Sequence, residues 1–156
     1  MDVDGTLADG KIYMGEHGEA LKAFDVKDGY AIRNLLPKHG IIPAIITGRQ
    51  SKIVENRAKE LAVSLTYQNV NDKISLLKRI LAEHGLSFEE AAFIGDDVSD
   101  LDCLKACGLS GCPSDAVERV RSACSFVSNK RGGEGAVREF IEYITERNTR
   151  CNGLTG

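Results

Sequence analysis

The feature that most constrains the fold of this chain is an alternation of short β-prone runs with amphipathic stretches of helical length. Runs of this kind, separated by helices, predict βαβ units and a mainly parallel sheet, so the class is α/β. The strands are expected at residues 41–46, 64–67, 91–94, 109–112 and 125–127. The helices are expected near residues 29–36, 51–61, 72–84, 99–106, 116–122 and 135–147.

One segment interrupts this alternation near the N-terminus. The β-prone runs 11–14 and 20–25 flank a loop, 15–19, with the sequence Gly-Glu-His-Gly-Glu. Two such runs around a glycine-containing loop predict a β-hairpin.

Length and composition fit a single domain. The chain has 156 residues, of which 42% are hydrophobic and 28% are charged, and at this size one apolar core can support the fold without disulfides or a structural metal. Residues 1–147 are therefore predicted to form one domain with the hairpin insertion at 11–25. The polar residues 148–156 show no apolar periodicity and are expected to form a flexible tail.

Several function classes are disfavoured by charge and patterning. The formal net charge is −3 with both signs mixed along the chain, so no basic stripe is available for nucleic acid. The longest apolar run, 41–46, is broken by Pro43 and is too short for a membrane span. The N-terminus has neither a basic nor an apolar segment, which favours the cytoplasm over secretion.

The cysteines also favour a reducing compartment. The chain has five, without a C-x-x-C pair, which is typical of reduced thiols and not of a disulfide framework. Cys103 and Cys107 lie four apart on a predicted helix without a neighbouring histidine, so we interpret them as core thiols and not zinc ligands.

The start of the chain carries the strongest chemical signal. In the segment 2–6, Asp-Val-Asp-Gly-Thr, Asp2 and Asp4 point the same way if the backbone is extended, and Gly5 allows a sharp turn towards a ligand. A solvated acidic turn and a calcium loop are alternatives, although Leu7 and Tyr13 stand where an EF-hand needs Gly and Glu. A carboxylate at the end of a central strand needs about five apolar residues before it, and only Met1 precedes Asp2, so we expect upstream residues or an upstream module to complete this strand.

A second acidic cluster, Gly-Asp-Asp-Val-Ser-Asp at 95–100, directly follows the predicted strand 91–94. It is expected at the carboxyl edge of the sheet, where open α/β folds bind ligands. Asp97 or Ser99 could instead simply cap the following helix. Together with Asp2 and Asp4, the cluster offers several hard oxygen ligands on neighbouring strand ends, which predicts a Mg²⁺ site that leaves room for water and phosphate.

Two further positions supply what an anionic ligand needs. Thr47 ends the predicted strand 41–46 and is followed by Gly48, so its hydroxyl and nearby N–H groups can face an anion. Lys73 opens the helix 72–84 and brings an ammonium group to the same edge. A strand-end cap and a solvated lysine are the structural alternatives. A carboxylate that attacks a phosphate ester needs such positive charge and hydrogen bonds to offset like-charge repulsion.

Taken together, these pieces resemble the four motifs of the haloacid-dehalogenase-like phosphotransferases. The matching pieces are the segment 2–6, Thr47, Lys73 and the segment 95–97, and further matching segments are 9–13, 24–30, 46–49 and 132–139. These further segments resemble the small capless branch of the family, which contains 3-deoxy-D-manno-octulosonate 8-phosphate phosphatase. The resemblance covers residues 1 to about 147 and implies a Rossmann-like three-layer fold, with the protruding hairpin in place of a cap domain.

The resemblance also implies roles for individual residues. Asp2 would be the nucleophile that forms an aspartyl-phosphate, and Asp4 would protonate the leaving sugar oxygen and later activate water. Mg²⁺ would be held by the Asp2 carboxylate, the Asp4 backbone carbonyl and Asp96, with Asp97 beyond them or acting through water. The phosphoryl group would be bound by Gly5, Thr47, Gly48 and Lys73. Asp100 would orient Lys73 or a metal-bound water, and the segment 132–139 would lie near the site.

Partners and substrate follow from the same resemblance. Family members form homotetramers in which the hairpin packs on a neighbouring subunit, although packing on its own domain is an alternative. Arg49 can bind a sugar-acid carboxylate bidentately, and it favours the eight-carbon ester, because related nine-carbon 9-phosphate phosphatases have an acidic residue there. A solvated arginine remains an alternative for Arg49.

Three functions are therefore in competition. The first is a Mg²⁺-dependent phosphatase for the small-molecule sugar-acid phosphate 3-deoxy-D-manno-octulosonate 8-phosphate. The second is a phosphatase for a nine-carbon sugar acid or another small ester. The third is a non-catalytic assembly domain of a sugar-nucleotide synthetase, against which the clustered acids argue, because a module kept for packing has no physical need for them.

Overall fold

The computed structural model describes the backbone of residues 1–153 and the side chains of residues 1–148. Its centre is a parallel sheet. Strand β3 (Ala44–Ile46) pairs in parallel with β4 (Leu65–Tyr67), and β5 (Ala92–Ile94) pairs in parallel with β6 (Leu109–Cys112), which pairs with β7 (Phe126–Val127). The predicted α/β class with a mainly parallel sheet is confirmed.

The first two residues join these two groups of strands. Ile46 N donates to Met1 O at 3.0 Å on one side, and Asp2 N donates to Ile94 O at 3.0 Å on the other. The amino group of Met1 also donates to Ala44 O at 2.8 Å. The strands therefore follow the order β4, β3, the segment 1–2, β5, β6 and β7, with the start of the chain at the centre.

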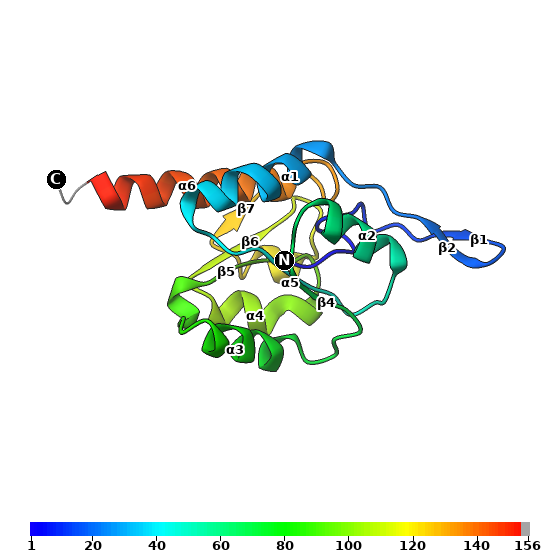
Figure 1. The fold of residues 1–156 in the computed structure, drawn as a ribbon, viewed down its shortest axis with the longest axis horizontal. Helices are drawn as coiled ribbons and strands as arrows, with labels where there is room; N and C mark the ends of the chain where they lie inside the picture. The colour runs from blue at the N-terminus through cyan, green and yellow to red at the C-terminus, as the bar shows by residue number, and fades with distance from the viewer. Residues whose placement is uncertain (154–156) are drawn as a thin grey trace.

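Helices cover both faces of the sheet, which makes three layers (Figure 1). Helices α2 (Lys52–Glu60) and α6 (Ala136–Gly153) pack on one apolar core, together with the π-helix Ala31–Leu35 that continues α1 (Val26–Tyr30). Helices α3 (Lys73–Glu83), α4 (Leu101–Ala106) and α5 (Glu118–Arg121) pack on the other. Successive strand residues alternate between the two cores. Ile45 and Ile94 enter the first core, whereas Ile46 and Phe93 enter the second, as the period of two in a strand requires.

Side-chain caps explain where the site-bearing helices begin. The Asp72 carboxylate accepts from Ser75 N at 3.1 Å before α3, and the Ser51 hydroxyl accepts from Ile53 N at 3.3 Å before α2. Helix α3 then buries Leu76, Leu77, Ile80 and Leu81 at helical spacing. These two helices fall within the predicted ranges 51–61 and 72–84.

Other boundaries differ from the prediction. The helix expected at 29–36 begins at Val26, because Asp25 caps it by accepting from Lys27 N at 2.6 Å, and it continues as a π-helix (Ala31–Leu35) and a 3-10 turn (Leu36–His39). The helix expected at 99–106 starts with a 3-10 turn at Val98–Asp100, and a further 3-10 turn lies at Phe88–Glu90. The helix expected at 116–122 is shortened to α5.

The end of the last helix was predicted wrongly. Helix α6 runs six residues past Arg147, to Gly153, and not to 147, where the tail 148–156 was expected to begin. The segment after Arg147 contains no proline, and Gly153 is its first strong helix breaker after Gly135. The rest of the predicted tail, residues 154–156, lies outside the described residues.

The predicted hairpin is present. Strand β1 (Tyr13–Gly15) pairs antiparallel with β2 (Gly18–Leu21), with Gly15 opposite Gly18 around a tight turn, and it projects from the body of the molecule (Figure 1). Past β2 the chain returns beside the segment that follows Asp2, where Phe24 bridges antiparallel to Ala8. Within the part of the chain that the structure describes, no helix is both long and apolar enough to cross a membrane.

Candidate active site

The predicted site residues lie at the carboxyl ends of adjacent strands. Asp2 ends the central segment, Thr47 follows β3, Lys73 opens the helix after β4, and Asp96 follows β5 by one glycine. Asp2, Thr47 and Lys73 are buried. This edge is where parallel sheets place their ligands.

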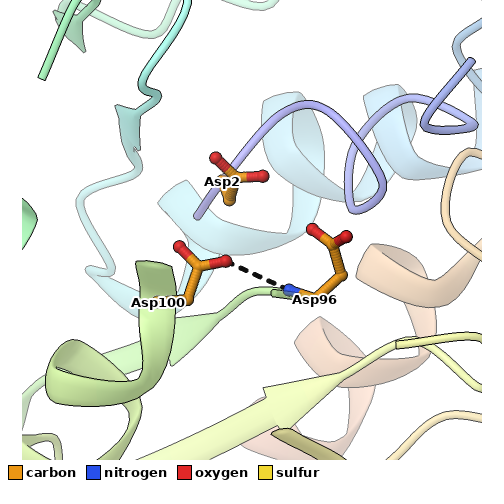
Figure 2. A group of neighbouring side chains, drawn as sticks. All are labelled: Asp2, Asp96 and Asp100. Carbon is orange, nitrogen blue, oxygen red and sulfur yellow. Dashed lines mark hydrogen bonds between the residues drawn. The ribbon is translucent and has the colours of Figure 1, made fainter. Parts of the chain in front are cut away.

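Three carboxylates converge there. Asp2, Asp96 and Asp100 each offer an oxygen within 4.8 Å of the others, and Figure 2 shows them at the end of the N-terminal segment, at the end of β5 and at the start of α4. Asp100 is held by two backbone donors, Asp96 N at 3.2 Å and Asp97 N at 3.3 Å. Its carboxylate therefore closes the loop between β5 and α4.

Lys73 bridges two of the three acids. Its Nζ donates to Asp2 Oδ1 at 2.7 Å and to Asp100 Oδ1 at 2.7 Å, with all three side chains buried. Burial lowers the pKa of Lys73, but the charges of Asp2 and Asp100 outweigh it and raise that pKa above its usual value. The lysine is thus a fixed positive charge at the centre of the site, in the position expected from the sequence.

The surroundings of Asp2 and Asp96 disfavour the ionised form of both carboxyl groups. Burial, followed by the neighbouring charge of Asp100, raises the pKa of Asp2 despite its pairing with Lys73. Burial and the nearby Asp2 carboxylate raise the pKa of Asp96 to about 7. Within the described residues Asp96 has no cationic partner, and only the Thr6 hydroxyl donates to its side chain, at 3.0 Å.

This donor set fits a divalent cation. Clustered carboxylate oxygens are the hard ligands that Mg²⁺ prefers, and a cation between Asp2 and Asp96 would offset the repulsion that raises both pKa values. The side chains present therefore fit the magnesium ion that the sequence predicts.

Backbone geometry keeps the loop that carries Asp2 and Asp4 against Asp96. Gly5 has a φ of +91°, and a Cβ placed on it would lie 2.1 Å from Asp96 Oδ2, so only glycine fits there. The segment 132–139 lies against the same loop, because Gly133 N donates to Thr6 O at 3.0 Å. A Cβ on Gly132 would lie 1.9 Å from Gly5 O.

Asp97 is not part of the acidic group. Its side chain is exposed and accepts from Val98 N at 2.7 Å, which makes it the cap of the short helix Val98–Asp100. The capping alternative raised for this position therefore describes the structure. Asp100 takes the third place in the group, because it ends the 3-10 turn Val98–Asp100 and its carboxylate points back to the backbone of the loop at Asp96 and Asp97.

The second predicted acid, Asp4, lies at the mouth of the site. Its side chain is 22% exposed, and its Oδ2 lies 3.8 Å from Arg49 Nε. Gly48 and Arg49 are both exposed beside the buried Thr47. Asp4 Oδ1 accepts a hydrogen bond from Lys22 Nζ. Lys22 was not predicted as a site residue, because no motif marks a lysine that extends to the site from the end of a hairpin.

Comparisons with known proteins agree with this geometry. A family model described as haloacid dehalogenase-like hydrolase matches residues 65–141. The 3-deoxy-D-manno-octulosonate 8-phosphate phosphatase of Yersinia pestis is 42% identical over 155 residues, which cover 99% of this chain and 82% of the relative.

Solved structures show the same similarity. The crystal structure of the Yersinia pestis phosphatase superposes with a TM-score of 0.87 at 43% identity, covering 90% of this chain and 76% of that one. The Moraxella catarrhalis phosphatase, solved with magnesium, phosphate and the sugar acid KDO, superposes with a TM-score of 0.89 at 38% identity, covering 99% and 89% of the two chains. The cobalt-bound enzyme of Haemophilus influenzae gives a TM-score of 0.88 at 36% identity, over 93% of this chain and 84% of that one.

Proposed function

The chain belongs to the haloacid-dehalogenase-like family of 3-deoxy-D-manno-octulosonate 8-phosphate phosphatases, and from this premise we propose the role of each of its site residues. The protein is a Mg²⁺-dependent phosphoric monoester hydrolase that converts this ester into the free sugar acid and phosphate. The observation that supports the assignment most directly is the buried Asp2–Lys73 ion pair beside Asp96 and Asp100.

Asp2 is the nucleophile in the proposed reaction. Lys73 binds its Oδ1 at 2.7 Å, which leaves the second carboxylate oxygen to attack phosphorus and form an aspartyl-phosphate. The bond from phosphorus to the sugar oxygen breaks, and the leaving oxygen takes a proton from Asp4. Asp4 then removes a proton from the water that hydrolyses the aspartyl-phosphate, which regenerates Asp2.

The phosphoryl oxygens are bound by groups at the same strand ends. Lys73 supplies a buried positive charge, and the Thr47 hydroxyl with the backbone N–H groups at Gly5 and Gly48 supplies hydrogen bonds. Asp100, at 2.7 Å from Lys73, fixes the direction of the ammonium group. This charge neutralisation and positioning is what phosphoryl transfer requires.

Magnesium, when bound, neutralises negative charge on the phosphoryl group. We place it on the carboxylates of Asp2 and Asp96 and on the backbone carbonyl of Asp4. Asp97, whose side chain caps Val98–Asp100, would act on the ion through water.

We further propose that the protein is a cytoplasmic homotetramer. The hairpin exposes the apolar side chains of Ile12, Met14 and Leu21, each at least half exposed in the single chain, and a lone hairpin is only marginally stable in water. Burial of this face on a neighbouring subunit removes that exposure. The cysteines of the described residues are free thiols, which suits a reducing compartment.

The first test measures phosphate release from 3-deoxy-D-manno-octulosonate 8-phosphate with Mg²⁺ and with a chelator. We expect chelator-sensitive turnover, and a fall of roughly 10³-fold or more in Asp2→Asn with an unchanged circular dichroism spectrum, because the nucleophile is lost and the fold is not. Turnover retained in Asp2→Asn would refute the covalent mechanism. Absence of release from any phosphate ester by the folded wild-type protein would favour the assembly-domain alternative.

A second test addresses the choice of sugar acid. Arg49 is 45% exposed in its side chain and lies beside Asp4, where we propose that it contacts the substrate carboxylate, so Arg49→Glu should reduce kcat/KM on the eight-carbon ester by about 10- to 100-fold. Arg79→Glu, an exposed arginine on α3, is the control. An equal loss on nine-carbon sugar-acid phosphates would show that Arg49 does not select the substrate.

A further inference from the structure

The carboxylate of Asp4 is held by a lysine from the base of the hairpin. Lys22 directly follows β2, and its Nζ donates to Asp4 Oδ1 although the two residues are 18 apart in sequence. The Lys22 side chain is 1% exposed, compared with 22% for Asp4. A lysine that is this buried cannot reach a ligand at the mouth of the site, so its contact with the site is through Asp4.

A second carboxylate keeps Lys22 in place. Glu19 Oε1, from β2, lies 2.7 Å from Lys22 Nζ, and Glu19 Oε2 accepts from the Ser51 hydroxyl at 2.5 Å. Ser51 is the cap of α2, and its backbone N–H donates to Gln68 Oε1 at 2.7 Å. The base of the hairpin is thus tied to the body of its own chain by a continuous set of polar contacts.

The two oxygens of Asp4 are therefore in different surroundings. Oδ1 is bound by Lys22, whereas Oδ2 has Arg49 Nε at 3.8 Å, beyond hydrogen-bond distance. Arg49 is itself drawn towards Glu19, with Nη2 at 3.5 Å from Oε1. The ammonium group of Lys22 occupies Oδ1, so Oδ2 is the oxygen of Asp4 that is left to face a ligand.

We propose that Lys22 is a positioning residue for the leaving-group step: it holds Asp4 through Oδ1 and directs Oδ2 to the leaving oxygen. This inference rests on the proposed function, in which Asp4 is the acid. As the bond between phosphorus and the sugar oxygen breaks, the electron pair goes to that oxygen and the proton passes to it from Oδ2. The hairpin thereby completes the site of its own chain, whatever it contacts on a neighbour.

The proposal predicts an effect that depends on the leaving group. A sugar alkoxide is a poor leaving group that needs the proton, whereas the p-nitrophenolate of p-nitrophenyl phosphate leaves without one. In Lys22→Met we expect kcat on 3-deoxy-D-manno-octulosonate 8-phosphate to fall by about 10- to 100-fold, because a misdirected acid loses its alignment. The loss on p-nitrophenyl phosphate should be at least about fivefold smaller.

Two reference variants give the largest and the smallest loss of activity with which Lys22→Met is compared. Asp4→Asn removes the acid and should show the same dependence on the leaving group with a larger loss. Lys78→Met removes an exposed lysine on α3 and should leave both rates as in the wild type. If Lys22→Met does not fold, as judged by circular dichroism, Glu19→Gln weakens the support of Lys22 and should give the same pattern with a smaller loss.

The outcomes distinguish a failure of this inference from a failure of the proposed phosphatase function. An equal loss on both substrates in Lys22→Met, or a change in KM alone, would overturn the positioning role while the phosphatase assignment stands. Wild-type protein that releases no phosphate from either ester in Mg²⁺ would overturn both.

Discussion

At the scale of single residues, Asp28 carries a buried charge away from the strand-end site. It is fully buried, its Oδ1 accepts from Arg138 N at 2.6 Å in the first turns of α6, and its Oδ2 has no partner among the described residues. Burial raises the pKa of Asp28 to about 6. The residue is a long-range cap of α6 whose charged form is disfavoured by burial.

This setting predicts a pH dependence of stability. Between pH of about 4 and about 6 the folded protein keeps a proton on Asp28 that the unfolded chain has lost, so the free energy of unfolding falls as pH rises through this window. A rise of roughly two pKa units corresponds to about 3 kcal/mol. Asp28→Asn should flatten this part of the profile. Urea unfolding at several pH values measures it, and an unchanged slope in the variant would refute the assignment.

Gly5 offers a second prediction at this scale. In Gly5→Ala the new methyl group meets Asp96 Oδ2 at 2.1 Å, and the residue must keep a φ of +91°. We expect a loss of about 1–3 kcal/mol in stability and a severe loss of phosphate release, because the loop that carries Asp2 and Asp4 must move. Wild-type activity in this variant would show that the loop is not held by this contact.

At the scale of elements, the hairpin carries two sets of side chains with different roles. Glu19 on β2 and Lys22 directly after it extend into the site of their own chain. Met14 and Leu21 are instead exposed, at 67% and 50%. The first set acts within the chain, and we propose that the second acts between chains.

Charge on the exposed part of the hairpin should prevent assembly. In Met14→Glu with Leu21→Glu, burial of this face on a neighbour would desolvate two carboxylates, which costs several kcal/mol. Sedimentation should show a smaller species than the wild type, whereas Val127→Glu, at an exposed position on β7, should not change it. An unchanged mass in the double variant would place the interface elsewhere.

At the scale of the whole molecule, the start of the chain is also the centre of the sheet. Residues 1–2 hydrogen-bond to β3 and to β5, so Asp2, the proposed nucleophile, lies where the two groups of strands meet. The acids that it faces come from β5 and α4, far along the chain. Metal bound among them should therefore connect distant segments of the fold.

This arrangement predicts that Mg²⁺ stabilises the folded protein. An ion that binds only the folded state adds about 2.7 kcal/mol at a concentration of 100 times its dissociation constant. The thermal midpoint should rise with added Mg²⁺ and fall with a chelator. Asp96→Asn should abolish most of this dependence, and it should not destabilise the metal-free protein, because it removes a repelled carboxylate. An equal Mg²⁺ effect in the variant would place the ion at another site.

Much of this architecture follows from local sequence signals. The strand positions and the helices capped by Ser51 and Asp72 are predicted by apolar periodicity and by capping side chains, which act within a few residues. The positions of Asp2, Thr47, Lys73 and Asp96 at one edge of the sheet follow from the parallel βαβ order. The start of α1 and the C-terminal end of α6 were predicted wrongly. Asp25 caps α1 earlier than the apolar pattern indicates, and no strong helix breaker stops α6 before Gly153.

The fold class and the chemistry available at the site could be predicted from residue types and their spacing, since both depend on short segments of the chain. Which acids face one another depends on the tertiary structure. It brought Asp100 into the group and assigned Asp97 to a cap, and it carried Lys22 and Glu19 from the hairpin to Asp4. The contacts of Lys22 and Glu19 with the site join residues far apart in sequence. Whether Asp97 or Asp100 faces Asp2 depends on side-chain direction in the folded chain, which no local pattern encodes.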